Sequence, residues 1–228
     1  MSSNSVRELI DFTDDEERCL LSKGSWYHYN DDYLRYLKDS IGEIKTEYDP
    51  QYDYSEQIYE DFVESFFQNA REDPSNAQKN DDDIRKVLKR KYYTERAFNM
   101  QMERDYGFQN FDRDSRLLKG TKVEIMDLYK EGIMYAVKFG STSSKLCYAV
   151  DQSIASLRLY KHHQLNNMPP IHTVAIWFVL ERANHIEENG VPNINTLEML
   201  MLKNRLDQWK KEVRLQGYKP LIRVNYKV

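Results

Sequence analysis

Charged residues interrupt two apolar runs that the sequence predicts to be neighbouring strands. The first run, residues 122–129, carries Glu124 and Asp127, and the second run, residues 133–139, carries Lys138. Side chains alternate along a strand, so Glu124 and Asp127 face opposite sides of the sheet and only one of them lies beside Lys138. The sequence therefore predicts a carboxylate and an amine close together on one face of a hairpin.

The turn between the two runs decides which acid meets the lysine. If the turn holds two residues, Glu131 and Gly132, then Asp127 is a diagonal neighbour of Lys138 on one face. If the turn holds three residues, Glu124 lies opposite Lys138 instead. Glycine at the second turn position favours the two-residue turn. The sequence therefore favours Asp127 as the partner of the lysine.

An acid and a lysine on adjacent antiparallel strands are similar to the core of restriction-type nucleases. In such a core a carboxylate holds Mg²⁺, which activates a water and neutralises charge on the scissile phosphate. The lysine orients that water or stabilises the transition state. A second acid normally stands two residues before the lysine, where this sequence has Ala136. We therefore expect catalysis by Asp127, Lys138 and Glu124, and a Mg²⁺ site formed by Asp127 with Glu95 from the preceding helix.

Residues around the hairpin offer contacts for a nucleic-acid backbone. Ser143 and Ser144 end a loop of small residues before a predicted helix over 144–160, where backbone amides and hydroxyls can receive a phosphate. Gln152, on that helix, can hold a phosphate or a metal-bound water. A basic cluster that includes tyrosines precedes the hairpin and can follow a phosphate backbone. The nucleic-acid-binding residues that we expect are Ser143, Ser144, Gln152, Lys89, Arg90 and Arg96.

Each of these features also has a simpler structural explanation. Asp127 and Lys138 can form a cross-strand ion pair on a half-exposed face, worth roughly a few tenths of a kcal/mol. Ser144 can be the N-cap of its helix. The basic residues can form a solvated helix face that pairs with nearby acids. The sequence leaves these alternatives open.

Hydrophobic periodicity predicts the elements that position these residues. We expect helices over 82–105, 144–160 and 195–216, the last with Asn195 as its N-cap. The run at 172–180 is almost purely apolar, so it predicts a central strand that is covered on both faces. The helices before and after this strand are expected to cover its two faces.

The order of these elements predicts an α/β or α+β fold. Its centre is a mixed sheet that contains the hairpin, flanked by helices in a restriction-endonuclease-like topology. Residues 1–80 are expected to form a mainly helical N-terminal region. Residues 81–228 are expected to form the α/β core.

Composition limits the classes of partner. The 228 residues carry a net charge of -4, so nucleic-acid binding requires a local basic patch rather than a general basic field. Two distant cysteines, and no apolar run long enough to span a bilayer, predict a cytoplasmic protein without membrane contact. The acidic, tyrosine-rich segment 48–62 offers a surface for a protein partner, or its rings pack into the core.

A series of short motifs keeps a common order between residues 24 and 160. The motifs are GSWYHY (24–29), ERAFN (95–99), FDRDSRLL (111–118), VEIMDL (123–128), YAVK (135–138), SSKLCY (143–148) and DQS (151–153). They resemble a sporadically distributed family of uncharacterised prokaryotic proteins, often found in mobile or defence-associated gene neighbourhoods. The resemblance brings no established activity, but it implies one constellation of residues: Glu95, Asn99, Glu124, Asp127, Lys138, Ser143, Ser144 and Gln152.

These features together predict a metal-dependent, nuclease-like protein that acts on DNA or RNA. The gene neighbourhoods of the similar family suggest a role in antiviral defence or mobile-element conflict. The alternative is a catalytically inactive module of the same fold that binds nucleic acid or protein. The alanine at position 136 favours that alternative.

Overall fold

Helices and strands alternate along the chain in the computed structural model, which describes residues 12–111, 116–118, 121–123, 126–162, 168–181 and 185–228. The helices are α1 (Asp31–Gly42), α2 (Glu56–Glu64), α3 (Phe67–Glu72), α4 (Asp81–Lys91), α5 (Thr94–Tyr106), α6 (Ser143–Lys161) and α7 (Leu200–Leu215). The strands are β1 (Phe12–Asp14), β2 (Cys19–Ser22), β3 (Ser25–His28), β4 (Lys45–Glu47), β5 (Gln109–Asn110), β6 (Arg116–Leu118), β7 (Thr121–Val123), β8 (Leu128–Lys130), β9 (Ile133–Gly140), β10 (Thr173–Leu180), β11 (Glu187–Glu188), β12 (Val191–Pro192) and β13 (Lys219–Tyr226). None of the described helices is long and apolar enough to cross a membrane.

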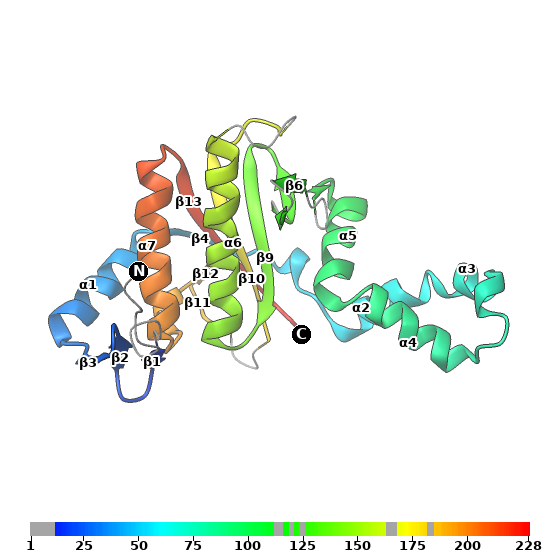
Figure 1. Ribbon diagram of the computed structural model, residues 1–228, viewed down its shortest axis with the longest axis horizontal. Coiled ribbons are helices and arrows are strands. Elements are labelled where there is room, and N and C mark those ends of the chain that lie inside the picture. Colours follow the sequence, from blue (N-terminus) through cyan, green and yellow to red (C-terminus); the bar gives the residue numbers. More distant parts are fainter. Residues whose placement is uncertain (1–11, 112–115, 119–120, 124–125, 163–167, 182–184) are drawn as a thin grey trace, which may run out of the picture.

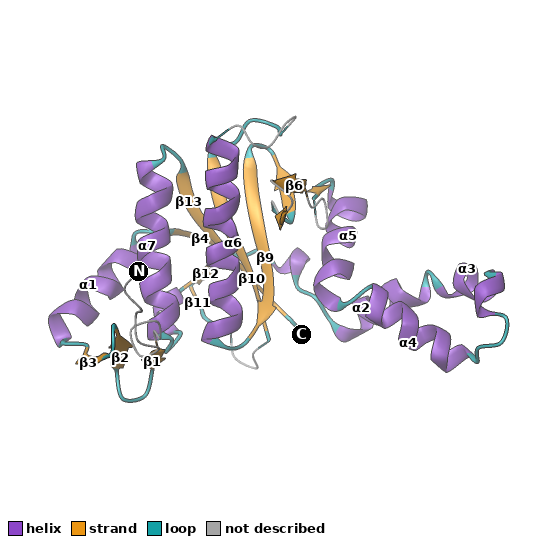
Figure 2. Ribbon diagram, in the orientation of Figure 1, coloured by secondary structure: helices purple, strands orange, loops and turns teal. Residues whose placement is uncertain are grey.

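A six-stranded mixed sheet forms the middle layer of the described structure, and buried clusters that include helix residues pack on both of its faces. α6 and α7 lie in front of the sheet in Figure 1 and Figure 2. The strand order is β4-β13-β10-β9-β8-β5. β8 runs antiparallel to its neighbours β9 and β5, whereas β4, β13, β10 and β9 run parallel to one another. The predicted α/β class, with a central mixed sheet that contains a hairpin and is flanked by helices, is confirmed.

β10 lies in the middle of this sheet, and all of its residues are buried. Val174, Ile176 and Phe178 point into one layer of the core, and Ala175 and Trp177 point into the other. A strand that is apolar on both faces needs neighbours on both edges and helices on both faces. The predicted central strand is therefore confirmed.

α6 and α7 cover the same face of the sheet, whereas the sequence predicted that they cover opposite faces. Leu146 of α6 and Leu206 of α7 share one buried cluster with Ile176 of β10. The strands β9, β10 and β13 are parallel and follow one another across the sheet, so both crossovers run in the same direction. Two right-handed crossovers in the same direction place both helices on one side (Figure 1).

The opposite face is covered by helices from earlier in the chain. The ring of Trp177 packs against Tyr52, Phe98 and Phe108, with centroids 5.2, 5.2 and 5.6 Å away. Phe98 belongs to α5, and Phe62 of α2 joins the same cluster. Several rings of segment 48–62 are buried here, so core packing explains why that segment is rich in aromatic residues.

The N-terminal part contributes strands as well as helices. β4 pairs in parallel with β13, so the predicted regions 1–80 and 81–228 share one sheet. β1, β2 and β3 form a separate antiparallel sheet near the N-terminal end of α7 (Figure 1).

A buried polar network fastens α1 to α7. The carboxylate of Asp207 accepts hydrogen bonds from Tyr36 at 2.9 Å and from Ser40, and it pairs with Lys211 at 2.7 Å. Burial acts to raise the pKa of Asp207, but the hydrogen bonds from Lys211, Ser40 and Tyr36 outweigh burial and lower it. The helix contact is therefore polar at its centre and depends on an ionised carboxylate.

Two predicted elements are divided in the structure. The predicted helix 82–105 is α4 and α5, separated at Tyr92, whose backbone angles of -114° and 60° leave the helical region. Its buried ring stacks on Phe66 with centroids 4.3 Å apart, so tertiary packing fixes the break. The predicted strand 122–129 is also divided, because β7 pairs with β6 while β8 pairs with β9.

The buried strand β10 gives a direct test of the fold. Val174→Asp places an unpaired charge at a site with 0% exposure, which we expect to cost several kcal/mol and to unfold most of the protein at room temperature. The same substitution at Val191, which is 54% exposed on β12, is expected to change the free energy of unfolding by less than about 0.5 kcal/mol. Circular dichroism during urea titration measures both variants. Equal destabilisation would contradict the central position of β10.

Candidate functional site

The hairpin β8–β9 has the predicted two-residue turn. Lys130 pairs with Ile133, and the turn residues Glu131 and Gly132 have φ of 50° and 79°. Positive φ at both central positions is the geometry of a type I′ turn. The preferred register is therefore confirmed, and it places Asp127 directly before β8. Glu124, the other predicted acid, lies outside the described residues.

β9 extends beyond β8, and two carboxylates bind the backbone amides that β8 does not reach. The last pair of the ladder joins Leu128 to Tyr135. Past this point, the amide of Val137 donates to Asp127 Oδ2 at 2.7 Å, and the amide of Phe139 donates to Glu95 Oε2 at 3.3 Å. Strand-edge amides that lack a partner strand require another acceptor. Asp127 and Glu95 thus complete the edge of β9 that faces away from β10.

Lys138 lies between these two amides in sequence and binds one of the carboxylates. Its Nζ lies 3.0 Å from Glu95, and both side chains are about one-fifth exposed, at 22% and 20%. The ammonium also lies 4.9 Å from the ring centroid of Tyr148 on α6. The pair is partly buried yet accessible, so a ligand from solvent can reach Lys138.

Asp127 and Lys138 lie on the same side of the sheet. Gln152 Nε2 donates to Asp127 Oδ1 at 3.4 Å, while Lys138 contacts Tyr148. Tyr148 and Gln152 are four residues apart on α6 and therefore share one face of that helix. The acid and the lysine thus lie beneath one stripe of α6. Four predicted site residues from separate elements thus form two pairs along β9, Glu95 with Lys138 and Asp127 with Gln152.

The predicted serines at the start of α6 have other partners. Thr142 is the N-cap residue of α6, so the alternative prediction that Ser144 caps the helix is wrong. Ser143 donates to Asp15 Oδ2 at 3.1 Å, and Ser144 lies 3.4 Å from the hydroxyl of Thr142. Asp15 also accepts from the amide of Leu200 at 2.7 Å. Ser143 thus helps to join the β1–β2 turn to the first turns of α6 and α7.

The predicted basic residues lie where α4 meets α5, with Lys89 and Arg90 before Glu95 and Arg96 directly after it. Lys89 pairs with Glu60 of α2, and Arg96 donates to the carbonyl of Lys91 at 2.8 Å. Arg90 is exposed. The ion pair of Lys89 agrees with a solvated helix face, whereas Arg90 and Arg96 remain candidates for contact with an anionic ligand.

A buried amide without a partner lies one helical turn after Glu95. Asn99 is 1% exposed, and within the described structure neither its Oδ1 nor its Nδ2 has a hydrogen-bond partner. Glu95 and Asn99 are four residues apart on α5 and share a face of that helix. An unsatisfied buried polar group costs about 1–3 kcal/mol, so Asn99 is ready to bind a water or a ligand. Only the family resemblance pointed to Asn99.

Thiol chemistry is not supported next to this site. Burial raises the pKa of Cys147, the neighbour of Tyr148, to about 11. The thiol is therefore protonated at neutral pH, and the thiolate that would act as a nucleophile is scarce.

The oxygen donors of the site fit Mg²⁺ in type. Mg²⁺ is usually bound by one or two carboxylates and completes its shell with water and phosphate oxygens, at about 2.1 Å. Asp127 and Glu95 provide two carboxylates, held at amides that lie about 7 Å apart along a strand. Among the described residues no group of three or more His, Cys, Asp or Glu gathers to hold a metal. A cation here would therefore depend on two carboxylates together with water or substrate oxygens.

These features define a mixed α/β protein with a polar site on β9, at the part of its edge that extends beyond β8. The chain belongs to a family of unknown function, DUF6119, whose profile matches residues 2–167. The matched range contains Glu95, Asp127, Lys138 and Gln152. Searches of curated proteins and of solved structures each found no match to the chain.

A comparison of two buried asparagines, Asn99 and Asn225, tests whether Asn99 stabilises the fold or is available to a ligand. Asn225 is 0% exposed, accepts from Trp177 Nε1 at 3.0 Å and donates to Asp49 and Asp53. Asn225→Leu removes these bonds and is expected to cost about 2–4 kcal/mol. Asn99→Leu removes no bond and is expected to leave the free energy of unfolding unchanged or raised. Chemical denaturation measures both variants, and an equal loss in Asn99→Leu would show that Asn99 has a structural partner.

Proposed function

We propose that this protein is a divalent-metal-dependent, nuclease-like enzyme that acts on nucleic acid. The observation that carries the proposal is the meeting of Glu95, Asp127, Lys138 and Gln152 at the free edge of β9. They come from α5, the residue before β8, β9 and α6.

The topology around the site supports the proposal. β8 and β9 form an antiparallel hairpin, α6 follows, and β10 then pairs in parallel with β9. An acid at the first strand and a lysine on the second is the arrangement that we associated with restriction-type nucleases. Glu95 of the preceding helix α5 contacts Lys138 and the amide of Phe139, which supports a role as the second acid.

Each residue would have a distinct role in binding and orienting a phosphodiester. Asp127 and Glu95 would hold Mg²⁺, which supplies an activated water and neutralises phosphate charge. The ammonium of Lys138 has three donors and uses one on Glu95, so its other donors can meet a phosphate oxygen. The amide of Gln152 orients Asp127 and can donate to a water.

The surroundings of the site supply contacts for the nucleic-acid backbone. Arg90 and Arg96 lie at the junction of α4 and α5, on either side of Glu95 in the chain. Arginine binds phosphate in a bidentate manner, which positions a strand without reading its sequence. We propose that the substrate is DNA or RNA of foreign origin, in antiviral defence or mobile-element conflict.

One observation favours a second function, a binding module without catalysis. Lys138 is already paired with Glu95, and each of the two carboxylates already accepts a strand amide. Ala136 stands where a further acid would complete a metal site. In this alternative the same edge would bind nucleic acid or a protein, and no product would form.

Cleavage of single- and double-stranded DNA and RNA, with Mg²⁺ and with chelator, tests the proposal. We expect cleavage in Mg²⁺ alone, reduced at least about 100-fold in Asp127→Asn and Lys138→Met because each removes charge from the site. Asn at position 127 can still accept the amide of Val137, so the melting temperature should change little. Lys145→Met and Asp105→Asn remove exposed or partly exposed charges elsewhere and should keep full activity.

The outcomes separate the two functions. Cleavage that is equal in chelator, or unchanged in Asp127→Asn, would exclude this site as the metal-dependent centre. Metal-independent binding of nucleic acid without product, weakened by Lys138→Met, would support the binding module instead.

A further inference from the structure

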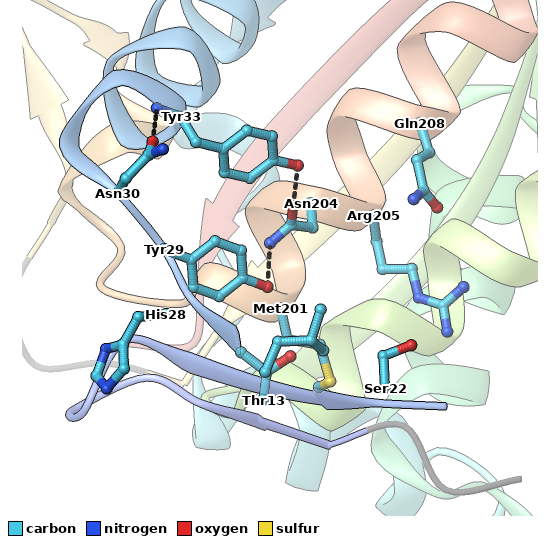
Figure 3. Close-up of a pocket in the computed structure, with 11 residues that line it drawn as sticks. Thr13, Ser22, His28, Tyr29, Asn30, Tyr33, Met201, Asn204, Arg205 and Gln208 are labelled. Carbon is cyan, nitrogen blue, oxygen red and sulfur yellow. Dashed lines mark hydrogen bonds between the residues drawn. The ribbon is translucent and has the colours of Figure 1, made fainter. Parts of the chain in front are cut away.

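A cavity lies between the small sheet β1–β3, the start of α1 and the helix α7 (Figure 3). Its volume is about 670 Å³. Small-molecule sites usually have volumes of about 300–1,000 Å³, so the cavity can hold a ligand of nucleotide size. None of the residues predicted for the candidate nuclease site lines it.

One side of the cavity is a rigid aromatic wall. The rings of Tyr29 and Tyr33 stack with centroids 5.6 Å apart and planes 14° from parallel. Tyr33 donates to Asn204 Oδ1 at 2.7 Å, and Asn204 Nδ2 donates to Tyr29 at 3.0 Å (Figure 3). One amide on α7 therefore holds both rings in place. A wall fixed before binding offers a flat ligand a surface at little cost in entropy.

The other side of the cavity is polar and cationic. Arg205 and Gln208 project from α7, and Ser22 comes from β2 below them (Figure 3). Arg205 lies 3.8 Å from Asp151, and the two side chains are 50% and 57% exposed. Such a long, exposed ion pair contributes little, so a phosphate can replace the carboxylate.

The charge of the lining favours an anion. Among the described residues that line the cavity, Arg205 carries the formal positive charge and none is Asp or Glu. The neighbouring cavity near Asp15 differs, because its lining includes Asp15, Glu16 and Glu198 as well as lysines. A lining with one guanidinium and no carboxylate repels an anionic ligand less than the acidic surface of a chain with a net charge of -4.

We infer that this cavity binds a nucleotide, with the base against Tyr29 and Tyr33 and the phosphate on Arg205. A nucleotide joins a flat aromatic ring to an anionic group, and the cavity presents an aromatic wall and a guanidinium on opposite sides. The nucleotide is either free or part of a single strand, since both present the same base and phosphate. The inference does not depend on the proposed nuclease activity, because binding here needs no metal.

Binding of adenosine 5′-monophosphate in chelator, measured by calorimetry, tests the inference. The nucleotide is expected to bind at least about tenfold more tightly than adenosine or inorganic phosphate, because only the nucleotide uses both sides of the cavity. Tyr33→Leu removes stacking that is worth roughly 5- to 150-fold in affinity. Arg205→Gln should weaken the nucleotide about tenfold or more and leave adenosine unchanged.

Matched controls keep the test specific. Tyr27→Leu changes a tyrosine of β3 that is 55% exposed and outside the cavity lining, and Arg158→Gln changes an arginine of α6 that is 60% exposed. Both should bind the nucleotide as the natural chain does. Tyr33→Phe keeps the ring and loses only the hydroxyl, so it should retain most of the affinity even if Tyr33→Leu fails to fold.

A single-stranded oligonucleotide, followed by fluorescence anisotropy in chelator, separates the two sources of the ligand. Tighter binding of the oligonucleotide, lost in Arg205→Gln, supports a nucleotide within a strand, and equal or weaker binding supports a free nucleotide. The inference is overturned if no nucleotide binds at millimolar concentration, if phosphate alone binds as well as the nucleotide, or if the variants bind like their controls. A protein inactive as a nuclease can still pass this test.

Discussion

The burial of β10 on both faces is the constraint on which the rest of the molecule depends. Val174, Ile176 and Trp177 are fully buried, so neither face can be left to solvent. The sheet must continue on both edges, through β9 and β13, and each face must carry helices. α6 is therefore held against the sheet, and its face with Tyr148 and Gln152 lies over the hairpin. The candidate site is positioned by this packing.

The edge of β9 beyond β8 serves both the sheet and the candidate site. β8 is short, and the strand amides beyond it need acceptors that water or side chains must supply. Carboxylates from α5 and from the residue before β8 take that role, at the amides on either side of Lys138, and one of them pairs with Lys138. The same contacts that complete the sheet thus build a polar site with hard oxygen donors. Backbone amides hold both carboxylates in place.

The two sites that we propose lie on either side of α6. Gln152 of that helix binds Asp127 at the hairpin, while the adjacent Asp151 faces Arg205 of the nucleotide cavity. Asp15 further links the small sheet to the first turns of α6 and α7. A single strand of nucleic acid that occupied the cavity would therefore pass close to the helix that carries part of the candidate site. α6 thus contacts both proposed sites, through Gln152 at the strand edge and through Asp151 at the cavity.

Local features of the sequence determined the buried strand, the two-residue turn at Glu131 and Gly132, and the helix α6. Each depends on residues close in sequence. The strand follows from consecutive apolar residues, the turn from a glycine that accepts positive φ, and the helix from apolar residues at helical spacing. Tertiary structure alone decided the rest. Asp15 caps α7 from 185 residues away, in place of the predicted Asn195, and Glu95 reaches Lys138 across 43 residues. The break at Tyr92, and the shared face of α6 and α7, follow from ring packing and crossover direction. Periodicity cannot report such contacts, because it describes one element and not its neighbours.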